Sequence, residues 1–256
     1  MLYGLYLSAQ GAQAQATRLD VLSNNLANAG TTGFKRDLAI FQSHRPYDVD
    51  NGGYSNSPGN QSALTGGVSP AKVVTDYSEG PLVHTGGALD VALTGPGYFQ
   101  VSDGKQQFLT RKGQFSLSAT GDLLLQGSGM KVLSNAGNPI NVPTEASRIE
   151  IGGDGTLSAV GGDGTRTQLA KLSTVKPNSD QQLEKVTGSL FRTNSPVSQT
   201  TGDSKLQPGF IEQSGVTPVS EMIDMVQASR MVEANVNMIK YQDDALDRLL
   251  QSAAPH

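Results

Sequence analysis

The sequence of 256 residues contains no cysteine. Without cysteine the chain can form no disulfide, use no thiolate nucleophile and build no cysteine-ligated zinc site. No apolar run approaches the roughly 20 residues that a membrane-spanning helix needs. These absences exclude several kinds of catalytic and metal chemistry before any motif is considered.

The sequence also lacks a large excess of either positive or negative charge. The chain has 19 Lys and Arg against 23 Asp and Glu, a net charge of −4. It therefore offers no basic field that would attract nucleic acid. Its first residues, MLYGLYLSAQ, lack the basic segment of a secretory signal peptide, so we expect no cleaved leader.

Motifs for catalysis and metal binding are missing as well. GGDGT occurs at 152–156 and at 161–165, the nine-residue spacing of calcium-binding β-roll repeats. Leu157 and Arg166 stand where that repeat needs Asp, so we interpret both copies as hairpin turns. The sequence has no nucleophile elbow, no phosphate-binding loop and no paired zinc histidines. We expect no enzyme activity, no cofactor and no bound metal.

What the chain does have is a helical pattern at each end. In residues 1–29 apolar side chains recur every three or four residues, and Gly30 is suited to end the helix. The predicted seam contains Leu2, Leu5, Ala9, Ala12, Ala16, Leu19, Ser23 and Leu26. Its small central residues would let a neighbouring helix approach closely.

The C-terminal segment repeats this spacing. Thr217 and Pro218 have the residue types of an N-cap and a first helical position, and the predicted helix runs to about Ser252. Its predicted seam contains Met222, Met225, Ser229, Val232, Val236, Ile239, Asp243, Leu246 and Leu250. The period of 3.5 residues is typical of coiled coils.

We therefore expect an α+β fold in which the N- and C-terminal helices pair as a coiled coil. Opposite charge supports the pairing, since residues 1–36 carry three bases and one acid, whereas residues 211–256 carry seven acids and three bases. The alternative is a pair of ordinary amphipathic helices packed on one core.

The middle of the chain predicts an antiparallel β-rich domain. Short apolar runs such as LDVAL, YFQV, QFLT, FSLS, LLLQ and LAKLSTV are separated by turns of the Asp-Gly type. Residues 48–70 are polar and rich in Gly, Asn and Ser. We expect helical assembly regions at 1–36 and 211–256, an extended linker at 37–80 and the β-rich domain at 81–210.

Four segments, in this order along almost the whole chain, resemble the bacterial flagellar rod and hook proteins of the axial family, most closely the basal-body rod subunits. They are NNLANAGTTGFKR (24–36), EGPLVHTGGALDVALTGPGYFQV (79–101), FLTRKGQFSLSATGDLL (108–124) and GFIEQSGVTPVSEMIDMVQASRMVEANVNMI (209–239). Gly215 stands where the family usually has Asn. The resemblance does not separate proximal from distal rod subunits.

The resemblance implies a subunit that polymerises into a helical tube and transmits motor torque to the hook. It implies partners that are copies of itself, other rod and hook proteins and the flagellar export apparatus, and a place in the periplasmic rod. The two seams would form the assembly interface, together with Asn24, Asn25, Asn28, Gly33 and Phe34.

Two alternatives stay open. One is a hook-type axial subunit. The other, from a different class, is a secreted β-rich carbohydrate-active enzyme, which needs a pair of carboxylates in one cleft. Asp90 and Glu150 are candidates for that pair, although nothing in the sequence brings them together and Asp90 is better explained as the outward-facing residue of an amphipathic strand.

Overall fold

The computed structural model describes residues 2–43, 68–143, 146–162, 164–178, 183–193, 197–199 and 204–253. The chain divides into two compact units. The helical unit contains Met1–Ala27, Asp37–Asp76 and Thr217–His256, and the β unit contains Asn28–Arg36 and Tyr77–Val216. The chain therefore leaves and re-enters the helical unit twice.

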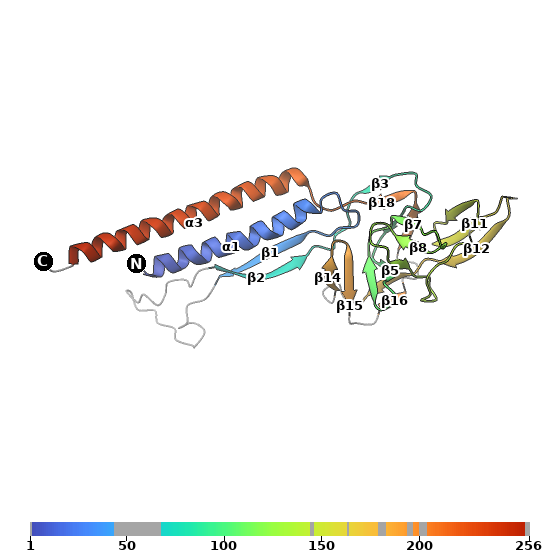
Figure 1. Cartoon of the computed structure of the whole chain (residues 1–256), viewed down its shortest axis with the longest axis horizontal. Helices are drawn as coiled ribbons and strands as arrows, with labels where there is room; N and C mark the ends of the chain where they lie inside the picture. Colours follow the sequence, from blue (N-terminus) through green and yellow to red (C-terminus); the bar gives the residue numbers. More distant parts are fainter. Residues whose placement is uncertain are drawn as a thin grey trace. The chain divides into compact units, whose positions relative to one another are not determined.

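The helical unit consists of two helices and a hairpin (Figure 1). Helix α1 covers Leu2–Ala27, and α3 covers Pro218–Ala253, as the C-terminal pattern predicts. Strand β1 (Asp37–Ser43) pairs antiparallel with β2 (Val68–Thr75). Helix α1 contacts both α3 and the two strands, so it is the central element of this unit. Residues 37–80, predicted as an extended linker, include these strands; the functional division of the chain at residues 36, 80 and 210 stays a prediction.

The α+β class is confirmed, but the predicted coiled coil is wrong. The residues of α1 that become buried are Ser8, Ala14, Val21, Leu22 and Asn25, whereas Ala9 and Ala16 of the predicted seam are exposed. Contacts with α3 are made by other residues, since a Cβ added at Gly11 would lie 2.9 Å from Oδ1 of Asn235. The physical reason is that α1 also packs against β1 and β2, so its buried face is not the one that a two-helix seam would bury.

The β unit contains strands that pair antiparallel throughout the described residues. Its largest sheet has the order β14-β15-β6-β5-β9-β8-β7; β13 also pairs with β5, and β16 pairs with β13. A three-stranded sheet, β10-β11-β12, and the pairs β17-β4 and β18-β3 complete the unit. The strands are β3 (Leu82–His84), β4 (Val91–Thr94), β5 (Tyr98–Ser102), β6 (Gln107–Thr110), β7 (Phe115–Leu117), β8 (Leu123–Leu125), β9 (Lys131–Val132), β10 (Arg148–Ile151), β11 (Thr156–Val160), β12 (Arg166–Lys171), β13 (Thr174–Pro177), β14 (Leu183–Thr187), β15 (Leu190–Thr193), β16 (Val197–Gln199), β17 (Lys205–Pro208) and β18 (Phe210–Glu212).

Two strand predictions differ in detail. The run LAKLSTV is two strands, β12 and β13, separated around Leu172, which forms a bridge with Ser134. In LDVAL, alternation predicts one buried face, but Val91, Ala92 and Leu93 are all buried. Strand β4 is enclosed on both faces, and an alternating sequence pattern does not reveal that.

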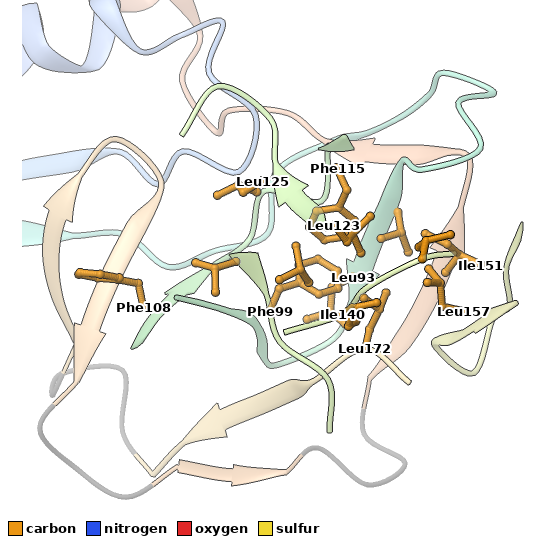
Figure 2. Close-up of a cluster of buried hydrophobic side chains, with 14 of the residues drawn as sticks. Leu93, Phe99, Phe108, Phe115, Leu123, Leu125, Ile140, Ile151, Leu157 and Leu172 are labelled. Carbon is orange, nitrogen blue, oxygen red and sulfur yellow. The ribbon is translucent and has the colours of Figure 1, made fainter. Parts of the chain in front are cut away.

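Apolar side chains from most of these strands meet in one cluster (Figure 2). Phe99 and Phe115 pack edge to face with ring centroids 5.5 Å apart. Around them lie fully buried aliphatic residues such as Leu123, Leu157 and Leu172. A second, smaller cluster forms around Phe191, which contacts the rings of Tyr77 and Tyr98. The β unit thus has its own hydrophobic core.

Candidate functional site

The motif NNLANAGTTGFKR is divided between the two units. Its first residues, up to Ala27, end α1 in the helical unit, and residues 28–36 belong to the β unit. The Asn25 side chain is 1% exposed. Its amide Nδ2 donates to the carbonyl of Asp37, and its Oδ1 accepts from the Asp37 N–H, both at 2.9 Å. Asn25 therefore fixes, within the helical unit, the point to which the chain returns after residue 36.

Gly33 and Phe34 are buried inside the β unit. Gly33 has a φ of +67°, and a Cβ at this position would lie 2.4 Å from the backbone nitrogen of Lys112. Only glycine combines that backbone conformation with so close an approach. The Phe34 ring is 1% exposed and has the Lys185 ammonium 3.7 Å from its centroid. Both residues are thus held by contacts within one subunit.

Lys35 is the centre of a buried ionic cluster. Its ammonium donates to Oε1 of Glu212 at 2.5 Å and to the carbonyl of Ser78 at 2.6 Å. Both charged side chains are 1% exposed. Arg111 approaches the second carboxylate oxygen of Glu212, with its Nη1 3.5 Å from Oε2. We refer to Lys35, Glu212 and Arg111 as the Lys35–Glu212 cluster.

The electrostatics of this cluster follow from its burial. Loss of water around the Lys35 ammonium lowers the pKa of that group, and the Glu212 carboxylate opposes the shift. Arg111 is held by backbone oxygens, because its guanidinium donates to Leu93 at 3.1 Å and to Gly95 at 2.7 Å. Removing one charged partner would leave an uncompensated charge in the interior. The sequence predicted an assembly role for the neighbouring Phe34 and did not identify this cluster.

The remaining predicted interface residues lie on the helices with different exposure. Ala9, Ala16, Asn24, Met222, Val236 and Leu250 are exposed, whereas Leu5, Ala12, Leu19, Leu26, Asn28, Met225, Val232, Ile239 and Leu246 are partly buried. The Leu2 side chain lies outside the described side chains. The helices approach each other through other positions, including the ion pair of Arg18 with Asp224 at 3.4 Å. The assignment of these residues to an interface between subunits stays a prediction.

Sequence reasoning missed a row of exposed apolar residues at the start of α3. Val219, Ile223 and Val226 are 67%, 55% and 52% exposed, and Met222 lies between them at 51%. Their i, i+3, i+4, i+7 spacing places all four on one face. We refer to these four residues as the α3 stripe. The signal was present in the sequence, but the heptad reading retained only Met222 from the four.

A second set of exposed apolar residues continues along α3. It consists of Met231, Met238, Tyr241 and Leu249, which are 49–70% exposed. Their spacings of seven, three and eight residues place them near a common face of the helix. Large apolar side chains are therefore exposed along most of the length of α3.

The acids considered for catalysis have separate structural partners. Asp90 accepts a hydrogen bond from the Thr85 hydroxyl at 2.6 Å. Glu150 forms ion pairs with Arg148 and, at 2.8 Å, with Arg166. Among the described residues, no three His, Asp or Glu side chains are grouped closely enough to hold a metal ion. None of the described helices is long and apolar enough to cross a membrane.

A β unit with its own core is joined to helical ends that leave rows of apolar side chains exposed. This arrangement is typical of the class of proteins that associate with other chains. Three family profiles match different parts of the chain, and all three describe flagellar rod or hook proteins. Residues 5–35 match the profile of flagella basal body rod proteins, and residues 92–159 match the D1 domain of flagellar hook protein FlgE/F/G. Residues 207–252 match the C-terminal region of the flagellar basal body rod FlgEFG proteins.

Individual relatives cover almost the whole chain. The chain is 32% identical over 261 residues to the flagellar basal-body rod protein FlgG of Bacillus subtilis, with 98% of each protein covered. It is 31% identical to FlgG of Buchnera aphidicola subsp. Acyrthosiphon pisum, over 98% of this chain and 100% of the relative. It is also 31% identical to the rod protein FlgF of Escherichia coli, with 98% of each covered. The chain belongs to the flagellar basal-body rod protein family.

Proposed function

We propose that this chain is a structural subunit of the bacterial flagellar basal-body rod and polymerises into a helical tube that transmits motor torque to the hook. The α3 stripe is the observation that carries the proposal. Burial of an apolar side chain contributes roughly 1.5–3 kcal/mol, and these four residues gain little of it in the single chain. A neighbouring subunit that covered them would be stabilised by their burial.

The small residues on α1 support the same role. Ala9 and Ala16 are exposed, so a helix of another subunit can approach the α1 backbone closely at these points. Close approach of helices gives a dense interface, and dense packing resists deformation. The predicted assembly residues on α1 and α3 are kept as part of this proposal, with the α3 stripe added to them.

Family membership supports the remaining parts of the proposal. The proposed partners are copies of this chain, other axial proteins and the flagellar export apparatus, and the proposed place of action is the periplasmic rod. The role is structural rather than enzymatic, since the relatives are named as rod proteins.

A polymerisation assay tests the proposal directly. The variant Ile223→Glu places a charge in the centre of the α3 stripe, where an interface would have to bury it without a partner. We expect the wild-type chain to form sedimenting polymers whose tubular form is visible by electron microscopy, and the variant to remain monomeric. The melting temperature of the monomer should not change, because Ile223 is more than half exposed.

Gln106→Glu is the matched control. Gln106 is exposed, lies in the β unit and gains the same charge outside the α3 stripe. Polymers of normal yield from Ile223→Glu would contradict the assignment of the α3 stripe. A wild-type chain that never associates at high concentration would contradict the proposed function itself.

A hook-type axial subunit is the second candidate, because the matched D1 profile covers hook as well as rod proteins. Deletion of the gene followed by imaging of basal bodies separates the possibilities. Assembly that stops within the rod indicates a rod subunit, and the stage of arrest distinguishes a proximal from a distal position. A complete rod that lacks a hook would indicate the hook-type role.

A further inference from the structure

The chain crosses between the two units four times. The crossings follow Ala27, Arg36, Asp76 and Val216. On the β-unit side these crossings involve only three segments, which are residues 28–36, residues 77–81 and residues 212–216. Any load that passes between the units along the chain must enter the β unit through one of these three segments.

All three segments are bound to one residue, Glu212. Its Oε1 accepts from Lys35 of the first segment at 2.5 Å and from the N–H of Gly80, in the second segment, at 3.0 Å. Its backbone carbonyl accepts from the N–H of Gly33 at 2.8 Å. Glu212 itself begins the third segment. The side-chain carboxylate and the backbone carbonyl of Glu212 therefore bind the first two segments to the third.

Backbone hydrogen bonds reinforce the same arrangement. The N–H of Gln213 donates to the carbonyl of Pro81 at 2.9 Å, and the N–H of Gly215 donates to that of Phe34 at 3.4 Å. The second and third segments lie so close that a Cβ at Gly80 would be 2.2 Å from the carbonyl oxygen of Gln213. The third segment is thus bonded along its length to the other two.

Because these contacts are buried, we expect them to break together rather than one at a time. The side chains of Lys35 and Glu212 are each 1% exposed, so no water replaces a broken contact. Arg111 adds a second positive charge that is fixed by backbone carbonyls and stacks at 5.3 Å on the ring of Tyr98. Separation of the first segment from the third leaves the opposite charges of Lys35 and Glu212 unpaired in the interior, which is strongly unfavourable. Separation of the second segment removes the hydrogen bonds of Gly80 and Ser78 to the same two side chains.

We propose that the Lys35–Glu212 cluster is the joint through which mechanical force enters the β unit, because it binds all the segments that connect the two units. This inference rests on the proposed function only for the source of the load, which is the torque on the rod. Lys35 and Glu212 are positioning residues, because they act by holding the three segments together. A residue that contributed only to the stability of the core would not need to contact all three.

Amide hydrogen exchange on the full-length monomer tests the proposal. The amides that report on the joint are those of Gly33, Gly80 and Gly215. The amides that report on the core are those of Leu133, which donates to the Gln100 carbonyl at 2.9 Å, and Ser173, which donates to the Leu133 carbonyl at 3.0 Å. In Lys35→Met we expect exchange at the joint amides to accelerate at least about tenfold more than exchange at the core amides, because the joint opens locally.

Leu123→Ala is the matched control. Leu123 is fully buried in the core of the β unit, and its truncation destabilises the unit without removing a joint contact. We expect this variant to accelerate exchange at the joint and core amides by the same factor. Glu212→Gln, which keeps the side-chain length, provides a second joint variant if Lys35→Met does not fold.

Equal acceleration of both sets of amides in Lys35→Met and in Glu212→Gln would overturn the proposal, since the cluster would then contribute only to global stability. Acceleration at Gly33 alone would also overturn it, because the three segments would then not be joined. The measurement is made on monomers, whereas the proposed function is tested by polymerisation. Failure of one is therefore distinguishable from failure of the other.

Discussion

The two units of this chain differ in how completely they bury their apolar side chains. The β unit encloses Phe99, Leu123 and Leu157 at 0% exposure and also encloses an ionic cluster. In the helical unit the described apolar residues that are well buried are few and mostly small, namely Ala14, Val21, Leu22 and Ala228. Most of the apolar surface of α3 stays exposed along a helix of 36 residues, about 54 Å.

Among the described residues, the β unit has the more extensive apolar core. A helix is stabilised mainly by packing of its apolar face, so a long helix with an uncovered face lacks part of that stabilisation. The β unit has a closed apolar core, and its connecting segments are hydrogen-bonded to one another. The single chain therefore combines a well-packed β unit with a helical unit whose exposed apolar surfaces are suited to assembly.

The largest test of this comparison removes one large apolar side chain from each unit. We expect Leu123→Ala to lower the free energy of unfolding of the β unit by about 3–5 kcal/mol, because it leaves a cavity in a closely packed core. Ile223→Ala removes the same kind of side chain from the α3 stripe, and we expect a change within about 0.5 kcal/mol in the monomer. Chemical denaturation followed by circular dichroism measures both values. Equal losses in the two variants would show that the helical unit is as complete as the β unit.

A smaller effect is expected where the helical unit has a buried polar contact. Asn25→Ala removes two hydrogen bonds to the backbone of Asp37 and leaves those groups unsatisfied. We expect a loss of about 1–3 kcal/mol, confined to the helical unit. The measurement is exchange of the Asp37 amide, with Ser23→Ala, an exposed position on the same helix, as the control. Unchanged protection of Asp37 would mean that Asn25 does not hold the returning chain.

The smallest effect is expected at the surface ion pair between the helices. The Arg18 and Asp224 side chains are 39% and 43% exposed, so solvent and salt screen their attraction. We expect Arg18→Ala to change stability by about 0.2–1 kcal/mol at low salt and by less at high salt. Thermal melts at two salt concentrations measure this. A loss as large as that of Leu123→Ala would contradict the description of this ion pair as a weak, solvent-screened contact.

Local patterns predicted the elements of the fold well. The α3 boundaries follow from Thr217, Pro218 and the apolar period, and strands β4 to β11 coincide with short apolar runs between glycine-containing turns. These signals are local, because each depends on residues only a few positions apart. The coiled coil was predicted wrongly because local spacing does not determine which face of a helix is buried. In an alanine-rich helix such as α1, several faces satisfy the 3.5-residue period, and the sequence does not say which of them the β1–β2 hairpin will cover.

The candidate site was predicted only in part. The sequence singled out residues 24–36 as a functional segment, and the interface role of Gly33 and Phe34 stays a prediction. The structure shows that both residues are buried within the single chain. Lys35 and Glu212 are 177 positions apart. Each looks like an ordinary surface charge in its own segment, and pattern reasoning cannot pair two charges across that separation.

The sequence by itself determined the family, the two terminal helices and the hairpins of the β-rich middle, because these depend on residue types at short spacing. The tertiary structure decided which face of α1 is buried, which apolar residues of α3 remain exposed and which charges are enclosed. Those outcomes depend on which distant segments come together, since burial changes the energy of a charge or an apolar group only after the fold has removed its water. Lys35 and Glu212 are the clearest case, because the fold makes their two charges into a buried pair.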